Sequence, residues 1–132
     1  PLISEDTSLS LVWEENLGSG IFTDKILSLN DNTHRQSVVP SQGIHLVLDK
    51  SFLKSDKGIM IPKTSDGRVL FIIPWNDKVI AGTTDTLINK YSLEPVALES
   101  EIDFILNTME AYLIRKPKRE EVLSVYAGLR PL

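Results

Sequence analysis

Three polar side chains in this sequence stand beside apolar stretches and have the types that catalysis and anion binding require. His45 lies within the apolar run Ile44–Leu48. Thr83 lies in a Gly-Thr-Thr-Asp segment, and Arg130 stands between a leucine and a proline. An imidazole has an ordinary pKa of about 6.5, so it can accept a proton near neutral pH. A guanidinium is a planar, two-pronged donor that matches a phosphate or a carboxylate, so we expect a small anionic ligand.

Each of these side chains also has an ordinary structural explanation, which the residues alone leave open. His45 could be a hydrogen-bonded core histidine. The segment that carries Thr83 could be a simple turn in which Asp85 bonds its own backbone. Arg130 could form an internal salt bridge if it is buried. His34 lies in a polar stretch, and we expect it to be solvated.

Composition and missing motifs exclude several classes of function. The chain has 132 residues, no cysteine and a net charge of -4, with 14 Lys and Arg against 18 Asp and Glu. Disulfides and thiolate chemistry are excluded, nucleic acid is not an expected partner, and a reducing compartment such as the cytoplasm is expected. No glycine-rich dinucleotide or nucleotide motif and no metal motif occurs. No apolar run reaches the roughly 18 residues of a membrane-spanning helix.

The residues around His45 predict an antiparallel sheet. In a strand over Ile44–Leu48, the period of two turns His45 away from Ile44 and Leu46. Apolar runs at 58–62 and 69–74 flank an Asp-Gly turn, which is a strong hairpin pattern. A second turn at Asn76-Asp77 leads to a strand from Val79 to Ala81. Strands joined by such short turns are antiparallel, because a parallel pair needs a crossover of about a dozen residues.

A helix is predicted over residues 100–115, because its apolar residues recur at helical spacing on one face. These residues are Ile102, Ile105, Leu106, Met109 and Leu113. Ser100 followed by Asp103 resembles a capping box, and Pro117 is expected to end the helix. The remaining predicted segments are a strand at 8–13, a helix at 23–29, a polar loop at 30–42 and a strand at 122–127. The fold class is therefore α+β, with an antiparallel β-sheet layer covered by helices.

Both ends of the sequence suggest a piece of a larger protein. The chain begins at Pro1 without an initiator Met and stops at Leu132 directly after a strand-like segment. We expect residues 1–19 to be an uncertain strand followed by a flexible Gly/Ser linker. Residues 20–132 are then expected to form one domain.

Four motifs occur in an order that matches a known family. They are Gly-Ile-His-Leu-Val at 43–47, Asp-Gly-Arg-Val-Leu-Phe-Ile-Ile-Pro-Trp at 66–75, Gly-Thr-Thr-Asp-Thr at 82–86 and Ser-Val-Tyr-Ala-Gly-Leu-Arg-Pro-Leu at 124–132. Each motif alone is weak, but the ordered set is specific. From about Gly20 to its last residue, the chain resembles FAD-dependent glycerol-3-phosphate dehydrogenase.

The resemblance implies the substrate, or cap, domain of a glutathione-reductase-type flavoprotein, the group that includes D-amino-acid oxidase. In this family glycerol 3-phosphate gives a hydride from C2 to FAD and becomes dihydroxyacetone phosphate, and electrons pass to membrane quinone. The parent enzyme is expected to be peripheral on the inner membrane. On the matching positions, His45 would lie near the reacting carbon, Thr83 would hydrogen-bond the substrate and Arg130 would bind its phosphate. The fragment alone is expected to fold, but neither to bind FAD tightly nor to turn over substrate.

Two other functions stay open on the sequence. The same cap could serve an oxidase of amino acids or 2-hydroxy acids, because Arg130 could equally bind a carboxylate. Alternatively, the chain could be a non-catalytic interaction domain in which His45 and Arg130 are satisfied by neighbouring groups. In either case a fragment could self-associate through surface that it normally buries.

Overall fold

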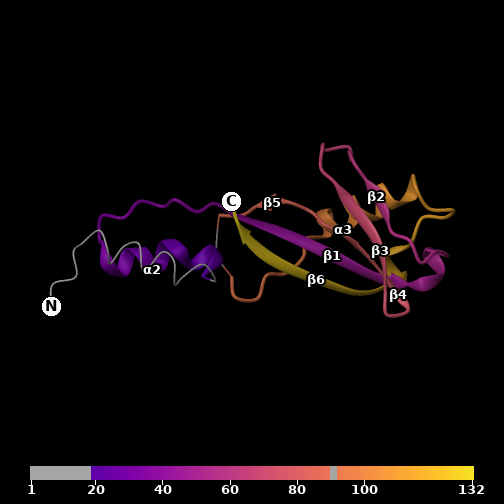
Figure 1. The fold of residues 1–132 in the computed structure, drawn as a ribbon, viewed down its shortest axis with the longest axis horizontal. Coiled ribbons are helices and arrows are strands. Elements are labelled where there is room, and N and C mark those ends of the chain that lie inside the picture. Colours follow the sequence, from indigo (N-terminus) through magenta and orange to yellow (C-terminus); the bar gives the residue numbers. More distant parts are fainter. Residues whose placement is uncertain (1–18, 90–91) are drawn as a thin grey trace.

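The computed structural model describes residues 19–89 and 92–132, and these form an α+β fold (Figure 1). The α-helices are α2 (Thr23–Asn30) and α3 (Glu99–Glu110). The strands are β1 (Pro40–Asp49), β2 (Ile59–Ile61), β3 (Leu70–Trp75), β4 (Lys78–Gly82), β5 (Thr86–Leu87) and β6 (Val122–Pro131). Short 3-10 helices are η1 (Gly20–Phe22), η2 (Lys50–Phe52) and η3 (Arg119–Glu121). The predicted fold class is confirmed. The predicted strand at 8–13 lies outside the described residues.

The sheet is built around β1. On one side β1 pairs with β4 and, near its start, with the short strand β5, while on the other side it pairs with β6 along almost its whole length. Strands β3 and β2 continue the sheet outward from β4, and every pair is antiparallel. The long strands β1 and β6 lie side by side in Figure 1. Segments that are far apart in the sequence therefore meet on β1.

Both predicted hairpin turns are confirmed, and their backbone angles explain the residue types. Asn76 and Asp77, between β3 and β4, have φ angles of 43° and 59°, which Asn and Asp tolerate better than most residues. Gly67, between β2 and β3, has a φ of 87° and donates its N–H to the Thr64 carbonyl at 2.9 Å. The local sequence therefore determines both reversals of the chain.

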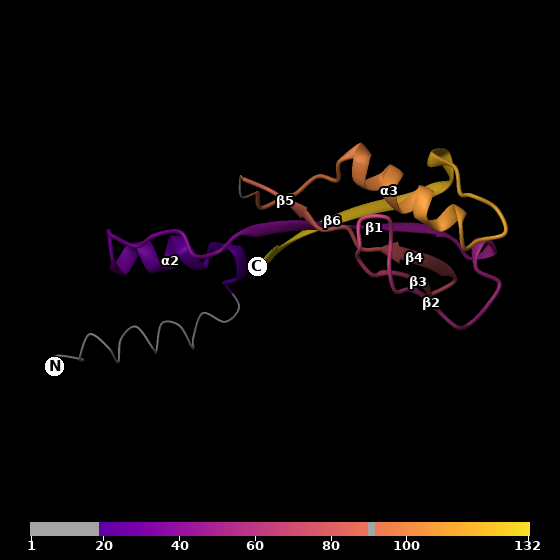
Figure 2. The same ribbon diagram turned by 90° about the horizontal axis from the view of Figure 1, so that it is seen from above.

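Helix α3 covers one face of the sheet and supplies part of the hydrophobic core (Figure 2). The buried apolar residues on the sheet side include Ile44, Leu46, Leu48, Ile61, Leu70, Ile72, Val79 and Ala81. Those on the helix are Ile102, Ile105, Leu106 and Met109. Helical spacing puts the latter on one stripe, as predicted. Burial of each of the larger side chains in this set, Ala81 excepted, stabilises the fold by about 1.5 to 3 kcal/mol.

The ends of α3 differ from the prediction. The helix stops at Glu110, where the backbone tightens: the Tyr112 N–H bonds the Met109 carbonyl three residues earlier, while the Leu113 N–H makes a four-residue helical bond to the same carbonyl. Pro117 therefore does not terminate it. The prediction that Ser100 and Asp103 form a capping box at the start of the helix is wrong as well. The carboxylate that accepts a backbone N–H at the helix start belongs to Glu101, which bonds Leu98 N at 2.9 Å.

The two longest strands extend beyond their predicted ends. Strand β1 begins at Pro40, inside the predicted polar loop, and β6 runs through Arg130. The ladder continues there because Ser41 faces Arg130 and Gln42 faces Leu129 across the pair. Strand β5 was not predicted. Pairing with a distant strand thus overrides the polar character of these residues.

Helix α2 is confirmed and lies beyond the end of the sheet where β1 begins (Figures 1 and 2). The Asp24 carboxylate links it to the following loop by accepting from Ser37 N at 3.0 Å and Val38 N at 2.8 Å. His34 Nε2 lies 2.8 Å from the same carboxylate, so the expectation that His34 is simply solvated is wrong. Burial alone would raise the Asp24 pKa, but these bonds outweigh it and hold the pKa well below its ordinary value.

Candidate active site

The outer face of the sheet, which points away from α3, carries the predicted site. Alternation along β1 turns Ile44 toward the core and His45 outward, as expected. His45 is directly opposite Gly82 of β4 and Tyr126 of β6. Two residues earlier in β1, Gly43 lies opposite Gly128. Directly opposed residues share a face, so His45 and Gly43 lie on the same outer face.

His45 is held between its two neighbouring strands. Its ring stacks on Tyr126, with centroids 5.1 Å apart and planes inclined by 11°. Its other side lies against Gly82, where an added Cβ would be only 2.4 Å from His45 Cδ2. Burial lowers the His45 pKa, and the positive charge of Arg130 lowers it further. The imidazole is therefore neutral near pH 7, which is the form that can accept a proton.

Thr83 and Arg130 meet over Gly43. An added Cβ on Gly43 would lie 2.6 Å from Thr83 Oγ1 and 2.8 Å from Arg130 Nη2. Both side chains donate to the carbonyl oxygen of Thr84, Thr83 through its hydroxyl at 3.1 Å and Arg130 through Nη2. The structure thus brings His45, Thr83 and Arg130 together on one face, while their catalytic roles stay predictions.

Asp85 is the acidic partner of this cluster. Its Oδ1 lies 3.5 Å from Arg130 Nη2 and accepts a hydrogen bond from the Ser41 hydroxyl. The side chains of Arg130 and Asp85 are each 41% exposed, so water screens the pair and leaves it weak. Arg130 therefore does form an internal salt bridge, with Asp85, but its guanidinium stays accessible from solvent. Asp85 bonds Ser41 rather than its own backbone, unlike the simple turn considered above.

The rest of the outer face is apolar and exposed. Exposed apolar side chains on it are Met60, Phe71, Ile73, Trp75 and Tyr126. Next to His45 this face contains an open hollow of about 580 Å³, lined also by Val47, Ile80 and Lys78. A hollow with apolar walls and an imidazole at its edge suits a small molecule or the flat ring of a cofactor.

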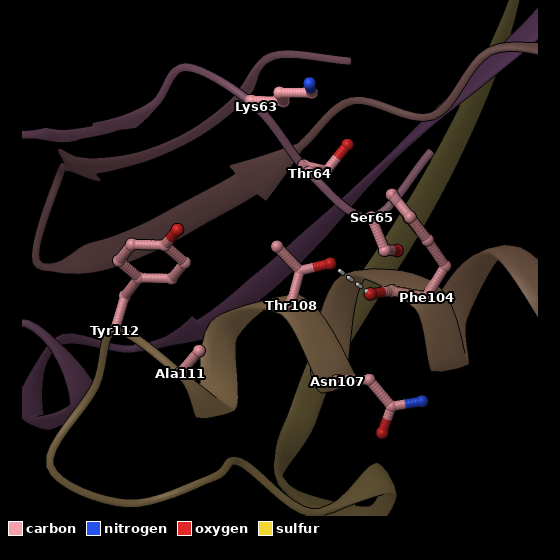
Figure 3. A pocket seen from close by; sticks show the side chains of 8 residues that line it. All are labelled: Lys63, Thr64, Ser65, Phe104, Asn107, Thr108, Ala111 and Tyr112. Carbon is pink, nitrogen blue, oxygen red and sulfur yellow. Dashed lines mark hydrogen bonds between the residues drawn. The ribbon is translucent and has the colours of Figure 1, made fainter. Parts of the chain in front are cut away.

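A separate hollow of about 430 Å³ lies between α3 and the loop before β3 (Figure 3). Its walls include the hydroxyls of Thr64, Ser65 and Thr108, and the Thr108 hydroxyl donates to the Phe104 carbonyl at 2.8 Å. It shares no lining residue with the hollow beside His45. Within residues 19–89 and 92–132, no group of three or more His, Asp or Glu is arranged to hold a metal ion. No helix of this part is long and apolar enough to cross a membrane.

The sequence contained weak signals for four further residues around the cluster. Gly43 and Asp85 flank predicted site residues, and Tyr126 follows the polar-apolar alternation of β6. Glu101 precedes Ile105 by four positions, so an acid falls on the buried side of the helix. The contacts of these four residues depend on strand pairing, which local patterns do not define.

A family model described as FAD dependent oxidoreductase matches residues 17–132. The chain belongs to this family. Among curated family members it is 40% identical to a mitochondrial glycerol-3-phosphate dehydrogenase of Schizosaccharomyces pombe, over 86% of this chain and 19% of that protein. It is 41% identical to the mitochondrial glycerol-3-phosphate dehydrogenase SDP6 of Arabidopsis thaliana, over 86% of this chain and 18% of that protein. The chain therefore spans about a fifth of the length of these relatives.

A solved structure from the family has the same fold. The glycerol-3-phosphate dehydrogenase of Bacillus halodurans, solved in complex with FAD, matches with a TM-score of 0.72 and 33% identity. The match covers 82% of this chain and 22% of that protein. The antiparallel sheet with one covered face is thus the arrangement of a part of an FAD-containing oxidoreductase.

Proposed function

We propose that this chain is the substrate-facing part of an FAD-dependent glycerol-3-phosphate dehydrogenase, with residues 20–132 as its substrate-binding cap domain. The observation that carries the proposal is the convergence of His45, Thr83 and Arg130 over one face of β1. These are the side chains that a phosphorylated alcohol requires, and the relatives are named for that substrate.

Arg130 binds the substrate phosphate in this proposal. Its two contacts, to the Thr84 carbonyl and to Asp85, both use Nη2. A guanidinium carries five N–H donors, so its remaining donors can bond two phosphate oxygens. The Thr83 hydroxyl donates its one proton to the Thr84 carbonyl, so in this proposal it accepts a hydrogen bond from a substrate hydroxyl. Both side chains bind the molecule in one orientation relative to His45.

His45 accepts the proton of the substrate C2 hydroxyl. Its neutral state suits this role, and its stacking on Tyr126 fixes the plane of the ring. The C2–O bond becomes a carbonyl when the hydroxyl proton and the C2 hydrogen with its electron pair both leave, which yields dihydroxyacetone phosphate. The chemistry that FAD would supply in the complete enzyme is acceptance of that hydrogen and electron pair.

The described residues do not by themselves form an FAD site. Every strand pair among them is antiparallel, whereas the pyrophosphate of a dinucleotide is bound by a glycine-rich turn in a parallel βαβ unit. We propose that the remainder of the parent enzyme holds FAD. The exposed apolar outer face supports this, because monomeric proteins rarely leave such patches uncovered. The electrons would pass on to a membrane quinone, with the parent enzyme peripheral on an inner membrane.

Steady-state kinetics of the complete enzyme test the proposal. We expect glycerol 3-phosphate to reduce a dye, and Arg130→Ala to raise KM by about ten- to a hundredfold, because a charge-assisted bond contributes about 1.5 to 3 kcal/mol. Arg119→Ala, which removes an exposed partner of Glu99, is the matched control and should leave KM unchanged. The isolated chain with added FAD should give no dye reduction.

Other outcomes would select the rival functions. Turnover of a 2-hydroxy acid or an amino acid, without turnover of glycerol 3-phosphate, would identify an oxidase of carboxylates. An FAD-loaded complete protein that oxidises none of these compounds would indicate the non-catalytic domain.

A further inference from the structure

Thr84 connects the outer face of the sheet to a buried carboxylate. On the outer side, its carbonyl oxygen accepts from the Thr83 hydroxyl and from Arg130 Nη2. On the inner side, its own hydroxyl donates to Glu101 Oε1 at 2.9 Å and accepts from Ile44 N at 3.1 Å. The position of the Thr84 peptide group therefore determines where Arg130 and Thr83 point, and Glu101 is the group that holds Thr84.

Glu101 is unusual among the acidic residues of α3, because it is only 4% exposed. Its Oε1 accepts from the hydroxyls of Thr84 and Thr86, the latter at 2.7 Å. Its Oε2 accepts from Gln42 Nε2 at 2.7 Å and from Leu98 N at 2.9 Å. Burial alone would raise the Glu101 pKa, but these four hydrogen bonds outweigh it, so the pKa lies below its ordinary value. The group is therefore a carboxylate at neutral pH.

The four bonds fasten three separate segments to one anion. Gln42 belongs to β1, Leu98 directly precedes α3, and Thr84 and Thr86 belong to the segment that follows β4. No ion pair of the described part of the chain involves Glu101, so hydrogen bonds alone compensate its buried charge. A buried carboxylate with this number of donors is costly unless all are in place, which makes the arrangement rigid.

We propose that Glu101 is a positioning residue of the substrate site, which holds Thr84 so that its carbonyl oxygen aims the Arg130 guanidinium at the substrate phosphate. The inference rests on the proposed function for the identity of the substrate. Glu101 itself touches no substrate, since it lies on the inner side of the sheet. It acts through Thr84, and Arg130 makes the contact with the ligand.

Glu101→Gln separates this role from simple packing. The amide has the same shape, but its NH2 group cannot accept from Gln42 Nε2 and Leu98 N, which both donate at that side. Rotating the amide would instead present the NH2 group to the two threonine hydroxyls, which could then no longer both donate. Either orientation disturbs the contacts that hold Thr84 or the strand beside it.

The experiment measures phosphate recognition in the complete enzyme. We expect Glu101→Gln to raise KM for glycerol 3-phosphate about tenfold or more, with kcat within about twofold. A misplaced Arg130 guanidinium binds the phosphate less tightly in the ground state and in the transition state alike. The inhibition constant of inorganic phosphate, as a competitive inhibitor, should rise by the same factor. In an Arg130→Ala background, Glu101→Gln should change KM by less than about twofold, because the contact through which it acts is gone. Glu99→Gln, an exposed carboxylate in the same helical turn, is the matched control.

Each result bears on the inference. A lower melting temperature with unchanged KM and phosphate inhibition would overturn it, and so would additive effects of the Glu101 and Arg130 substitutions. If Glu101→Gln does not fold, Thr84→Val, which replaces the hydroxyl that bonds Glu101 and Ile44 N with a methyl group, serves for the same comparisons. If the wild-type enzyme does not oxidise glycerol 3-phosphate, the proposed function fails instead. Calorimetric titration with inorganic phosphate would then still show whether Glu101 aims Arg130.

Discussion

At the scale of single residues, two glycines that face each other across β1 and β6 have different surroundings. A Cβ on Gly43 would lie 2.6 Å from Thr83 Oγ1 and 2.8 Å from Arg130 Nη2, whereas a Cβ on Gly128 would meet nothing within 4 Å. The absence of a side chain at Gly43 is thus what allows Thr83 and Arg130 to approach each other.

We predict that Gly43→Ala in the complete enzyme raises KM for glycerol 3-phosphate about tenfold, because the new methyl group pushes the guanidinium from its position. Gly128→Ala, the same change on the partner strand, should alter KM by less than about twofold. Steady-state kinetics of both variants make the comparison. Equal effects would show that the strand pair, and not the cluster over Gly43, responds to the added methyl.

The pH dependence of the reaction should follow His45. Protonated His45 cannot accept the substrate proton, so kcat/KM falls as pH drops through its pKa. Burial and then Arg130 lower that pKa, so the midpoint of this acid limb should lie below the ordinary value of about 6.5. A pH profile of the complete enzyme measures the midpoint. In His45→Asn this limb should disappear from the residual activity, whereas His34→Asn should retain it. A midpoint above 6.5 would contradict the role of His45.

At the scale of elements, α3 stabilises the sheet through its buried stripe. Ile105 is fully buried against the strands, whereas Ile114, just beyond the helix, is 99% exposed. We predict that Ile105→Ala lowers the free energy of unfolding of the chain by about 2 to 5 kcal/mol, because it leaves a cavity in the core. The chemically identical change Ile114→Ala should lower it by less than about 0.5 kcal/mol. Urea denaturation measures both, and similar midpoints would show that α3 is not packed on the sheet as described.

The elements also show how far local patterns extend. The turns at Gly67 and Asn76-Asp77 could be predicted, because Gly, Asn and Asp are the residue types that adopt the positive φ angles of such turns. The end of α3 could not, because Leu113 continues the apolar spacing although the backbone has already tightened into a three-residue turn at Tyr112. Strand β5 and the start of β1 could not be predicted either, since only their partner strands make them extended.

At the scale of the whole molecule, one face of the sheet is covered by α3 and the other exposes apolar side chains. Phe71 lies on this outer face and is 47% exposed. We predict that the isolated chain self-associates through the outer face, because association removes apolar surface from water.

Phe71→Lys should shift the chain toward the monomer, since the new charge lies within the apolar face. Ile114→Lys, which adds the same charge at an exposed apolar residue away from the sheet, should leave the association unchanged. Sedimentation velocity over a range of concentrations measures both variants. A chain that is monomeric at every concentration, or equal effects of the two lysines, would argue against the outer face as the surface of association.

The sequence by itself determined the features that depend on neighbouring residues: the two hairpin turns, the alternation that turns His45 away from Ile44, and the apolar stripe of α3. Its ordered motifs also identified the family. Only the tertiary structure decided that Thr83 and Arg130 meet over Gly43 and that Glu101 holds Thr84 from the opposite side. The physical reason is that strand register sets which side chains are opposed, and register is fixed by pairing between segments distant in the chain.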